Sequence, residues 1–284
     1  MDFSLSEERK MLQETVARFF ENNYNDIKKR SEYLDMNDGF SREFWKESSN
    51  LGVISGLISP SFGGLGGSGE DISIIFELIG KSLCIEPFLS SGLLSSTILS
   101  SIKNPKTELI NQIIDGELLV SFAHMEMNNR YEDHFVESKA FFEDENWKLN
   151  GSKSFVINGD SADKVIISAR IEGKINDKNG IGLFLVDNNQ INNRSYNTID
   201  GYRAAELNFD NIDAELLCED DLALECIIKA NSAGALALSA EAVGIMQVCF
   251  DLTLDYLKTR KQFGKSIGSF QRILHRMEDM MLEI

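Results

Sequence analysis

The stretch "NGSKSFVINGDSADKVII", residues 150–167, decides the fold class of this 284-residue chain. Two Asn-Gly pairs flank one β-rich run and precede another, and Asn-Gly between such runs is the strongest short-range hairpin signal. Similar runs at 118–120 and 182–186, with a further Asn-Gly pair at 179–180, extend the pattern. No helical crossover separates these runs. We therefore predict an antiparallel barrel or sandwich, and we exclude the doubly wound sheet of nicotinamide-dependent enzymes.

Helical patterns lie on both sides of this β-rich block. One predicted helix runs through "REFWKESSNLG" and ends at Gly52, and after residue 219 apolar residues recur at three- and four-residue steps on two faces. A helix that is apolar on two faces is packed from two sides, as in a bundle. We predict an α+β fold with an N-terminal all-α domain (1–115), a middle β-domain (116–218) and a C-terminal helical domain (219–284).

The last predicted helix reaches Ile284 without a capping signal. Two helices do not complete a bundle. We therefore expect that a C-terminal segment is absent from this chain, or that a partner supplies the missing helices.

Composition excludes several classes of function. The net charge of −17 argues against binding a nucleic-acid backbone, which needs clustered cations. Four cysteines and three histidines show no metal-ligand spacing, so we expect no metal site. The N-terminus lacks the apolar core of a signal peptide, and no stretch approaches the uninterrupted apolar length of a membrane span. We expect a cytoplasmic protein that binds no membrane.

The stretch "YLKTRKQFGKSIGSFQ", residues 256–271, carries the strongest functional signal. An apolar helix runs into Arg260, followed by Phe263 and the pair Phe270-Gln271. A guanidinium fork suits phosphate oxygens, and rings beside it suit a flat cofactor. The alternative is that Arg260 is a cation favoured by the helix dipole at a helix C-terminus, with Phe263 in the core.

The order of these pieces resembles the acyl-CoA dehydrogenase family: helices, a β-domain with N-G-x-K, then helices with R-x-x-F-G and F-Q. A narrower resemblance, at 122–132 and 258–264, is to the small subunit of pimeloyl-CoA dehydrogenase, a branch that works beside a large subunit. The matching segments cover the chain in order: residues 3–8, 60–66, 150–159, 180–186, 201–206 and 256–271.

The resemblance implies a flavoprotein of fatty acid metabolism. FAD would lie between the β-domain and the C-terminal bundle, and the chain would catalyse α,β-dehydrogenation of an acyl-CoA thioester. Electrons would pass to an electron-transfer flavoprotein. The chain would form a homo- or hetero-oligomer with another acyl-CoA dehydrogenase subunit.

The resemblance also implies site residues. Arg260 would contact the flavin pyrophosphate across a subunit interface. Substrate-binding residues would be Tyr131, Ser232, Gly234 and Ala235. Cofactor-binding residues would be Phe122, His124, Met125, Tyr131, Phe155, Val156, Ile157, Arg260, Phe263, Phe270 and Gln271.

This sequence departs from the family at several of these positions. Met125 and Ile157 replace threonines, and Tyr131 replaces a serine in a turn whose glycines are gone. Close backbone approach is what glycine permits, so we expect an altered contact with the flavin.

No catalytic base is assigned. One family position for it is Gly234, the other lies beyond Ile284, and Glu241, about two turns after Gly234, is a weak substitute. Two hypotheses remain: a dehydrogenase whose base lies in a missing segment, or a non-catalytic subunit that completes a partner's FAD site.

Overall fold

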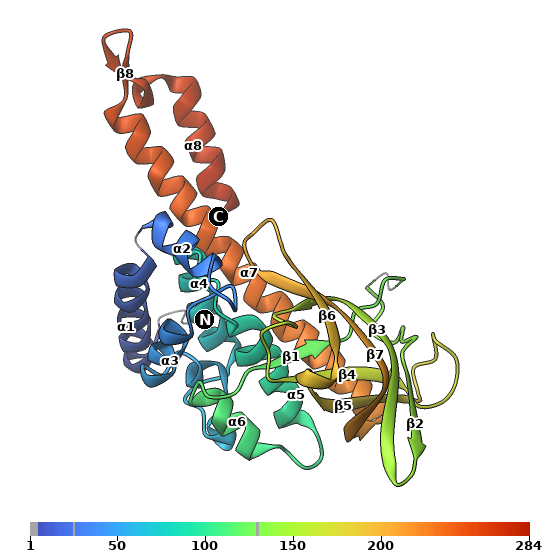
Figure 1. The fold of residues 1–284 in the computed structure, drawn as a ribbon. Helices are drawn as coiled ribbons and strands as arrows, with labels where there is room; N and C mark the ends of the chain where they lie inside the picture. Colours follow the sequence, from blue (N-terminus) through green and yellow to red (C-terminus); the bar gives the residue numbers. More distant parts are fainter. Residues whose placement is uncertain (1–4, 25, 129–130) are drawn as a thin grey trace.

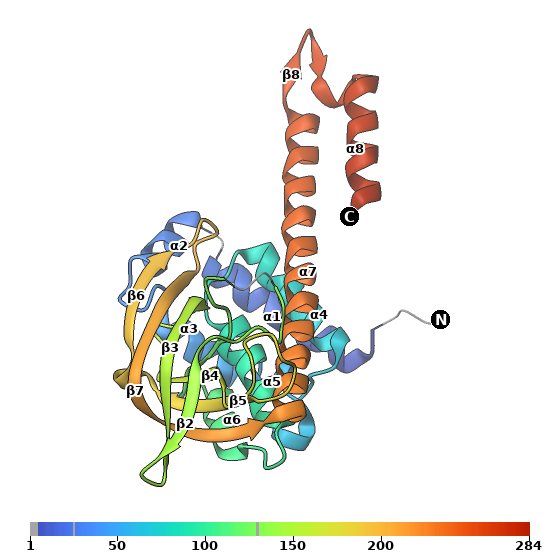
Figure 2. The same cartoon turned by 90° about the vertical axis from the view of Figure 1, so that its right-hand side faces the viewer.

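The computed structural model describes residues 5–24, 26–128 and 131–284. A helical N-terminal part packs against a curved sheet, and the long helix α7 (Asp220–Thr259) runs past both and projects beyond them (Figures 1 and 2). The predicted α+β order of helices, sheet and helices is confirmed. Four residues of the matched segments, namely Phe3, Ser4, Asn129 and Arg130, lie outside the described residues.

Short helices with side-chain caps build the N-terminal part. Ser41 accepts a hydrogen bond from the Phe44 N–H at the start of one helix, and Ser68 with Asp71 forms a capping box at the start of another. After Pro87 the chain continues as a π-helical segment. The helical segments are α1 (Glu7–Tyr24), α2 (Ile27–Leu34), α3 (Arg42–Asn50), η1 (Ser55–Leu57), η2 (Pro60–Phe62), α4 (Gly69–Ser82), η3 (Phe88–Ser95), α5 (Ser96–Ser101) and α6 (Thr107–Ile114).

A mixed sheet of seven strands, counted within the described residues, forms the middle part. Its order is β1-β4-β2-β3-β7-β5, with β6 paired to β7 and β4 also paired to β5. β1 runs parallel to β4, whereas the sequence predicted antiparallel pairing throughout. The strands are β1 (Val120–Ala123), β2 (Lys139–Glu143), β3 (Asn146–Ile157), β4 (Lys164–Arg170), β5 (Ile181–Asp187), β6 (Asn192–Asn197) and β7 (Arg203–Glu219), with η4 (Asn188–Gln190) before β6.

One of the three Asn-Gly turn predictions is wrong. Asn150-Gly151 lies inside β3, where the pairing with β7 shifts register, as at a β-bulge. The β2–β3 hairpin turns instead at Asp144-Glu145, whose φ angles are 51° and 65°. A hairpin turn and a bulge both need a residue with positive φ or without a side chain, so the dipeptide alone does not distinguish them.

Strands β4 and β5 of the sheet are buried on both faces. Ile166 and Leu183 belong to the core that the sheet shares with the N-terminal helices. Val165, Ile167 and Phe184 fill the opposite side, enclosed by the curved sheet itself. Because neighbouring strand residues point to opposite faces, these strands read as continuous apolar runs.

Among the described residues, helix α7 is packed mainly along its N-terminal part. Its N-terminal half lies against α4, α5, η3 and β5. Beyond Gly244, Leu257 is its only buried residue in the described chain. Exposed apolar side chains include Leu252 (67% exposed) and Tyr256 (57% exposed). The predicted two-sided packing is therefore not completed by the described residues.

By length and composition α7 also qualifies as a membrane-crossing helix, with a mean hydropathy of 1.6 over its most apolar 18-residue window. This corrects the expectation that no stretch approaches such a length. A core helix of a helical bundle meets the same criterion, so the finding is weak evidence for a membrane.

Two glycines let α4 and α7 cross with their backbones in contact. A Cβ atom at Gly80 would lie 2.0 Å from the Glu241 carbonyl oxygen, and one at Gly244 would lie 2.1 Å from the Glu77 carbonyl oxygen. Real Cβ contacts are never this short, so any side chain here would force the helices apart. This crossing fixes the position of α7 relative to the N-terminal part.

We expect Gly244→Ala to destabilise the fold by about 1–3 kcal/mol, because overpacking outweighs the gain in helix propensity. Gly234→Ala is the matched control on the same helix: its Cβ would meet the side chains of Leu94 at 3.0 Å and Leu89 at 3.9 Å, rather than the backbone of α4. Urea unfolding of both variants is the measurement. Equal midpoints for the two variants would contradict the proposed backbone contact.

A buried carboxyl group, Glu86, and a half-buried one, Glu241, lie where the N-terminal helices meet β7 and α7. The Tyr24 hydroxyl donates to Glu86 Oε2 at 2.6 Å. The Tyr202 hydroxyl lies 3.3 Å from the Cys84 carbonyl oxygen and 3.5 Å from Glu241 Oε1. Burial raises the pKa of Glu86 to about 7 and that of Glu241 to about 7. Both groups therefore hold a proton to higher pH than an exposed carboxyl group does.

After α7 the chain turns back through a two-stranded hairpin, β8 (Lys261–Gln262) and β9 (Lys265–Ser266). The short segment η5 (Ile267–Ser269) leads into α8 (Gln271–Glu283). Both views show the hairpin at the tip of the projecting arm and α8 running back along α7 (Figures 1 and 2).

Candidate functional site

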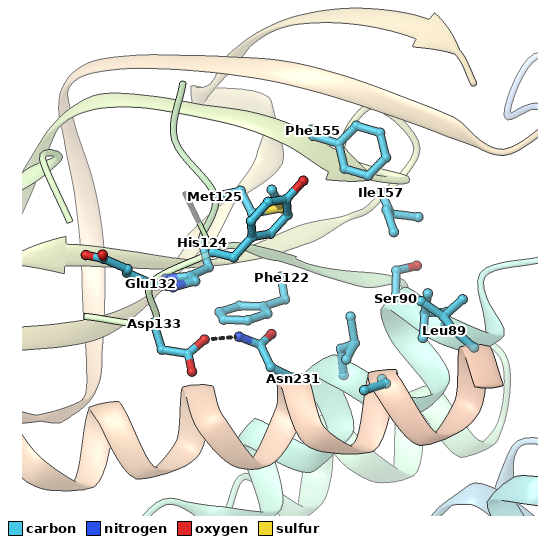
Figure 3. A pocket seen from close by; sticks show the side chains of 15 residues that line it. Leu89, Ser90, Phe122, His124, Met125, Glu132, Asp133, Phe155, Ile157 and Asn231 are labelled. Carbon is cyan, nitrogen blue, oxygen red and sulfur yellow. Dashed lines mark hydrogen bonds between the residues drawn. The ribbon is translucent and has the colours of Figure 1, made fainter. Parts of the chain in front are cut away.

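A cavity of about 440 Å³ lies between the sheet, η3 and α7 (Figure 3). Its sheet wall consists of Phe122, His124, Met125, Phe155 and Ile157. His124 is the only one of these five with a polar side chain. The volume lies in the range of small-molecule pockets, and an apolar wall with few polar groups is typical of them.

The helical wall of the cavity is also apolar. Leu89 and Leu94 come from η3, and Gly234, Ala235 and Leu238 come from α7. Gly234 is buried against the side chain of Leu94. Small residues on α7 therefore leave room between the helix and the sheet wall.

A loop after β1 covers one end of the cavity with polar groups. Tyr131, Glu132 and Asp133 line the cavity from this loop. Asn231 of α7 donates from Nδ2 to Asp133 Oδ1 at 2.6 Å, which ties the loop to the helix (Figure 3). Tyr131 has a φ of 69°, in the region that glycine prefers, and its side chain is 91% exposed.

His124 is 6% exposed and has a fixed ring position. Its ring lies parallel to that of Phe122, with centroids 5.8 Å apart and an interplanar angle of 4°. Nδ1 lies 2.9 Å from Ser168 Oγ. Burial, with a further contribution from the Lys153 ammonium, lowers the pKa of His124 to about 3. The ring is therefore neutral at physiological pH.

A buried ion pair supports the sheet wall from behind. Lys153 Nζ lies 2.6 Å from Glu126 Oε1, and the two side chains are 0% and 3% exposed. Burial raises the pKa of Glu126, but Lys153 and the hydrogen bonds from Ser138 outweigh it and leave the pKa lowered. Glu126 also accepts from the N–H groups of Glu137 and Ser138. The lysine of the N-G-x-K motif thus holds the loop that follows β1.

Six of the predicted cofactor-binding residues meet in the cavity, but Val156 does not. Val156 is 1% exposed and packs in the core enclosed by the sheet. Its neighbours Phe155 and Ile157 line the cavity, since adjacent strand residues face opposite sides. A register shift between Lys153 and Val156 and a φ of 52° at Phe155 turn the strand at this point. The six residues are Phe122, His124, Met125, Tyr131, Phe155 and Ile157.

Among the predicted substrate-binding residues, Tyr131, Gly234 and Ala235 line the cavity and Ser232 does not. Ser232 is exposed on α7. At about 100° per residue, Ser232 lies about 200° from Gly234 around the helix, although only about 60° from Ala235.

Arg260, Phe263, Phe270 and Gln271 lie at the tip of the projecting arm, not in the cavity. Arg260 is 26 residues after Gly234, which corresponds to roughly 39 Å along a helix. Phe263 is 91% exposed, and its ring meets that of Phe270 edge-on at 6.2 Å. Within one chain these residues and the cavity therefore cannot share a ligand site.

The described part of α7 presents no acid group to the cavity. Gly234 and Ala235 occupy the position expected for a base, and Glu241 does not line the cavity. The carboxylates among the described lining residues are Glu132 and Asp133.

Sequence reasoning missed several lining residues. Leu89, Ser90 and Leu94 sit in an apolar run that looks like any core helix, so no local signal marks them. Asn231 and Asp133 are 98 positions apart, and only the fold pairs them.

Family models identify what this architecture belongs to. The N-terminal domain of acyl-CoA dehydrogenases matches residues 6–116, and the C-terminal domain of the same family matches residues 224–284. Together the two models match more than half of the chain. The chain belongs to the acyl-CoA dehydrogenase family.

Individual relatives agree with this assignment. The probable acyl-CoA dehydrogenase YngJ of Bacillus subtilis is 28% identical over 298 residues, which cover 100% of this chain and 77% of the relative. The butyryl-CoA dehydrogenase structure from Megasphaera elsdenii has a TM-score of 0.88 at 21% identity and covers 100% of this chain and 77% of that one. The FAD complex of PigA has a TM-score of 0.88 at 24% identity and covers 99% and 76%.

Members of this family are FAD enzymes. The described cavity fits part of such a cofactor. Its sheet wall offers the rings of Phe122 and Phe155 to a flat ring system, and His124 has a buried Nε2 atom without a partner among the described residues. Gly234 has no side chain, so the opposite wall of the cavity leaves room for a ligand at this position.

Proposed function

We propose that this chain is a subunit of an FAD-dependent acyl-CoA dehydrogenase that oxidises the α,β-bond of an acyl-CoA thioester and passes electrons to an electron-transfer flavoprotein. One observation carries the proposal: residues from three distant motifs, represented by Phe122, Phe155 and Gly234, converge on one apolar cavity. We also propose a role in fatty acid metabolism and a cytoplasmic location.

Different residues of this site would contact FAD and the acyl chain. Phe155 and Ile157 would support the ring system of FAD, which supplies the acceptor for the β-hydride when it is bound. Gly234, Ala235 and Leu238 would pack along the acyl chain and exclude water from it. The hydrogen bond from Asn231 to Asp133 would hold the covering loop in place.

We further propose that the chain is the small subunit of a heteromer, as in the pimeloyl-CoA dehydrogenase branch. The apolar face of α7 is uncovered in its outer half, and the arm carries Arg260 and Phe263 far from the chain's own cavity. A second subunit that packs on α7 would bury this face and bring the arm to another cavity.

A non-catalytic role is the second candidate function. The absence of an acid group on the cavity-facing side of the described α7 favours it, because proton abstraction from an α-carbon needs a base within reach. In that case the chain would complete the FAD site of its partner and would not turn over substrate in its own cavity.

Anaerobic titration with acyl-CoA thioesters of several chain lengths tests the proposed function. The FAD-loaded chain is measured alone and after mixing with a large acyl-CoA dehydrogenase subunit, and loss of flavin absorbance reports reduction. Reduction of the FAD-loaded chain alone, or reduction in the mixture beyond that of the large subunit alone, supports a dehydrogenase. A second mixture contains the variant in which Gly234 and Ala235 are both replaced by leucine. If the flavin in this mixture is still reduced, the result favours the non-catalytic role.

We expect Arg260→Ala to lower the FAD content of the assembled protein by about tenfold, because a charge-assisted contact with a phosphate is lost. The thermal midpoint of the FAD-free chain should stay unchanged, since Arg260 is exposed at the end of the arm. Lys261→Ala, which removes the next exposed cation, is the matched control. Equal FAD content in the two variants would contradict the proposed contact between Arg260 and FAD.

A further inference from the structure

The hydrogen bonds around His124 define which ring nitrogen carries its proton. Ser168 Oγ lies 2.9 Å from His124 Nδ1 and also accepts a hydrogen bond from Lys153 Nζ at 3.0 Å. An ammonium group can only donate, so one lone pair of Ser168 Oγ is used by Lys153. The Ser168 hydroxyl proton remains to be placed.

Only one arrangement gives this proton an acceptor among the described residues. If Nδ1 carried the ring proton, it would donate to Ser168 Oγ, and the buried Ser168 hydroxyl would be left without an acceptor. If Nδ1 is unprotonated, the hydroxyl donates to it and both groups are satisfied. The first arrangement leaves both the Ser168 hydroxyl and the unprotonated Nε2 without partners, whereas the second leaves only Nε2–H without one. Because buried polar groups are nearly always hydrogen-bonded, the second arrangement is favoured. The neutral ring then carries its proton on Nε2.

This assignment leaves one donor without a partner beside the cavity. His124 Nε2 is buried and has no hydrogen-bond partner among the described residues. The residue is 6% exposed, its ring lines the cavity, and it is the only polar side chain on the sheet wall. A buried donor without an acceptor is costly, and beside a cavity the missing acceptor can be an atom of the ligand or an ordered water.

We propose that His124 binds the occupant of the cavity as a neutral donor, through a hydrogen bond from Nε2–H to a carbonyl-type acceptor. The identity of the acceptor rests on the proposed function: it is a carbonyl or ring nitrogen of the flavin, or the carbonyl oxygen of the acyl thioester. A second consequence is that Ser168 acts as a positioning residue, because its hydroxyl selects the tautomer.

The first test needs no ligand. The chain contains three histidines, so ¹⁵N imidazole NMR spectra can be assigned by single substitutions. We expect the His124 signals to show an unprotonated Nδ1 and a protonated Nε2. In Ser168→Ala, which removes the hydroxyl alone, the two tautomers should exchange. A protonated Nδ1 in the wild-type protein would overturn the proposal.

The second test identifies the acceptor. Binding of FAD to the purified protein, and of acyl-CoA to the FAD-loaded protein, is measured for the wild type and for His124→Phe, which keeps a ring beside Phe122 but removes the donor. About tenfold weaker FAD binding assigns the acceptor to the flavin, and a similar loss confined to acyl-CoA assigns it to the thioester. His275→Phe, on α8, is the control for a histidine-to-phenylalanine change.

Different results would contradict the role of His124 and the proposed function of the chain. Equal binding of both ligands by the wild type and His124→Phe would overturn the role of His124 and leave the proposed function intact. A wild-type protein that binds neither FAD nor acyl-CoA would refute the proposed function, and the NMR spectrum would still decide the tautomer. If His124→Phe does not fold, Ser168→Ala replaces it in the binding measurements, with a smaller loss of affinity for the same ligand expected.

Discussion

Lys153→Met is expected to lower the free energy of unfolding by about 3–5 kcal/mol. Lys153 and Glu126 are buried with their charged atoms 2.6 Å apart, and removing the ammonium leaves a buried carboxylate without its counter-charge. Lys153 also donates to the His124 carbonyl oxygen at 3.3 Å and to Ser168 Oγ at 3.0 Å. The loop that lines the cavity should therefore loosen together with the loss of stability.

Lys148→Met is the matched control. Lys148 lies on β3, as Lys153 does, and its ammonium is 2.8 Å from the exposed Asp213 on β7. Exposed pairs contribute about 0–1 kcal/mol, so this variant should stay close to the wild type. The double variant Lys153→Met with Glu126→Gln should recover part of the loss, since no buried charge remains. Urea unfolding that shows equal effects for Lys148→Met and Lys153→Met would contradict the structural role of the buried pair.

Glu86→Gln is expected to stabilise the protein at slightly alkaline pH and not at acidic pH. Burial raises the pKa of Glu86 from 4.5 to about 7. Between these values the folded state holds a proton that the unfolded state has lost, so stability falls as pH rises through this window. The shift corresponds to about 3 kcal/mol for a fully buried group.

The measurement is the difference in free energy of unfolding between Glu86→Gln and the wild type from about pH 4 to about pH 8. The lowered pKa of His124 makes the free energy of unfolding rise with pH at acidic pH, which is opposite to the effect of Glu86. This contribution is the same in both proteins and cancels in the difference. We expect the difference to grow as pH rises. A difference that is constant with pH would show that Glu86 titrates alike in the folded and unfolded states.

The sequence predicted the order of the structural blocks because each block has its own period and composition. Apolar residues spaced for a helix mark α4 and α7, and β-rich runs mark β4 and β5. Pairing was less predictable: the parallel contact of β1 with β4 depends on the intervening hairpin, and Asn150-Gly151 forms a bulge in place of a turn.

The site could be predicted where a motif is local and not where the fold joins distant segments. Phe155 and Ile157 followed from the motif after Asn150-Gly151, and strand alternation alone would have excluded Val156. The place of Arg260 depends on how far α7 projects, which no local pattern records. The contacts from Leu89 and Asn231 arise from packing between elements and carry no motif.

The most direct test of the FAD site is a titration of the purified protein with FAD, comparing Phe155→Ala with Phe142→Ala. Both side chains are exposed aromatic groups of the sheet, 45% and 63% exposed, but only Phe155 lines the cavity. We predict saturable binding that Phe155→Ala weakens about tenfold and Phe142→Ala leaves unchanged. Absence of binding, or equal binding by both variants, would contradict the placement of FAD in this cavity.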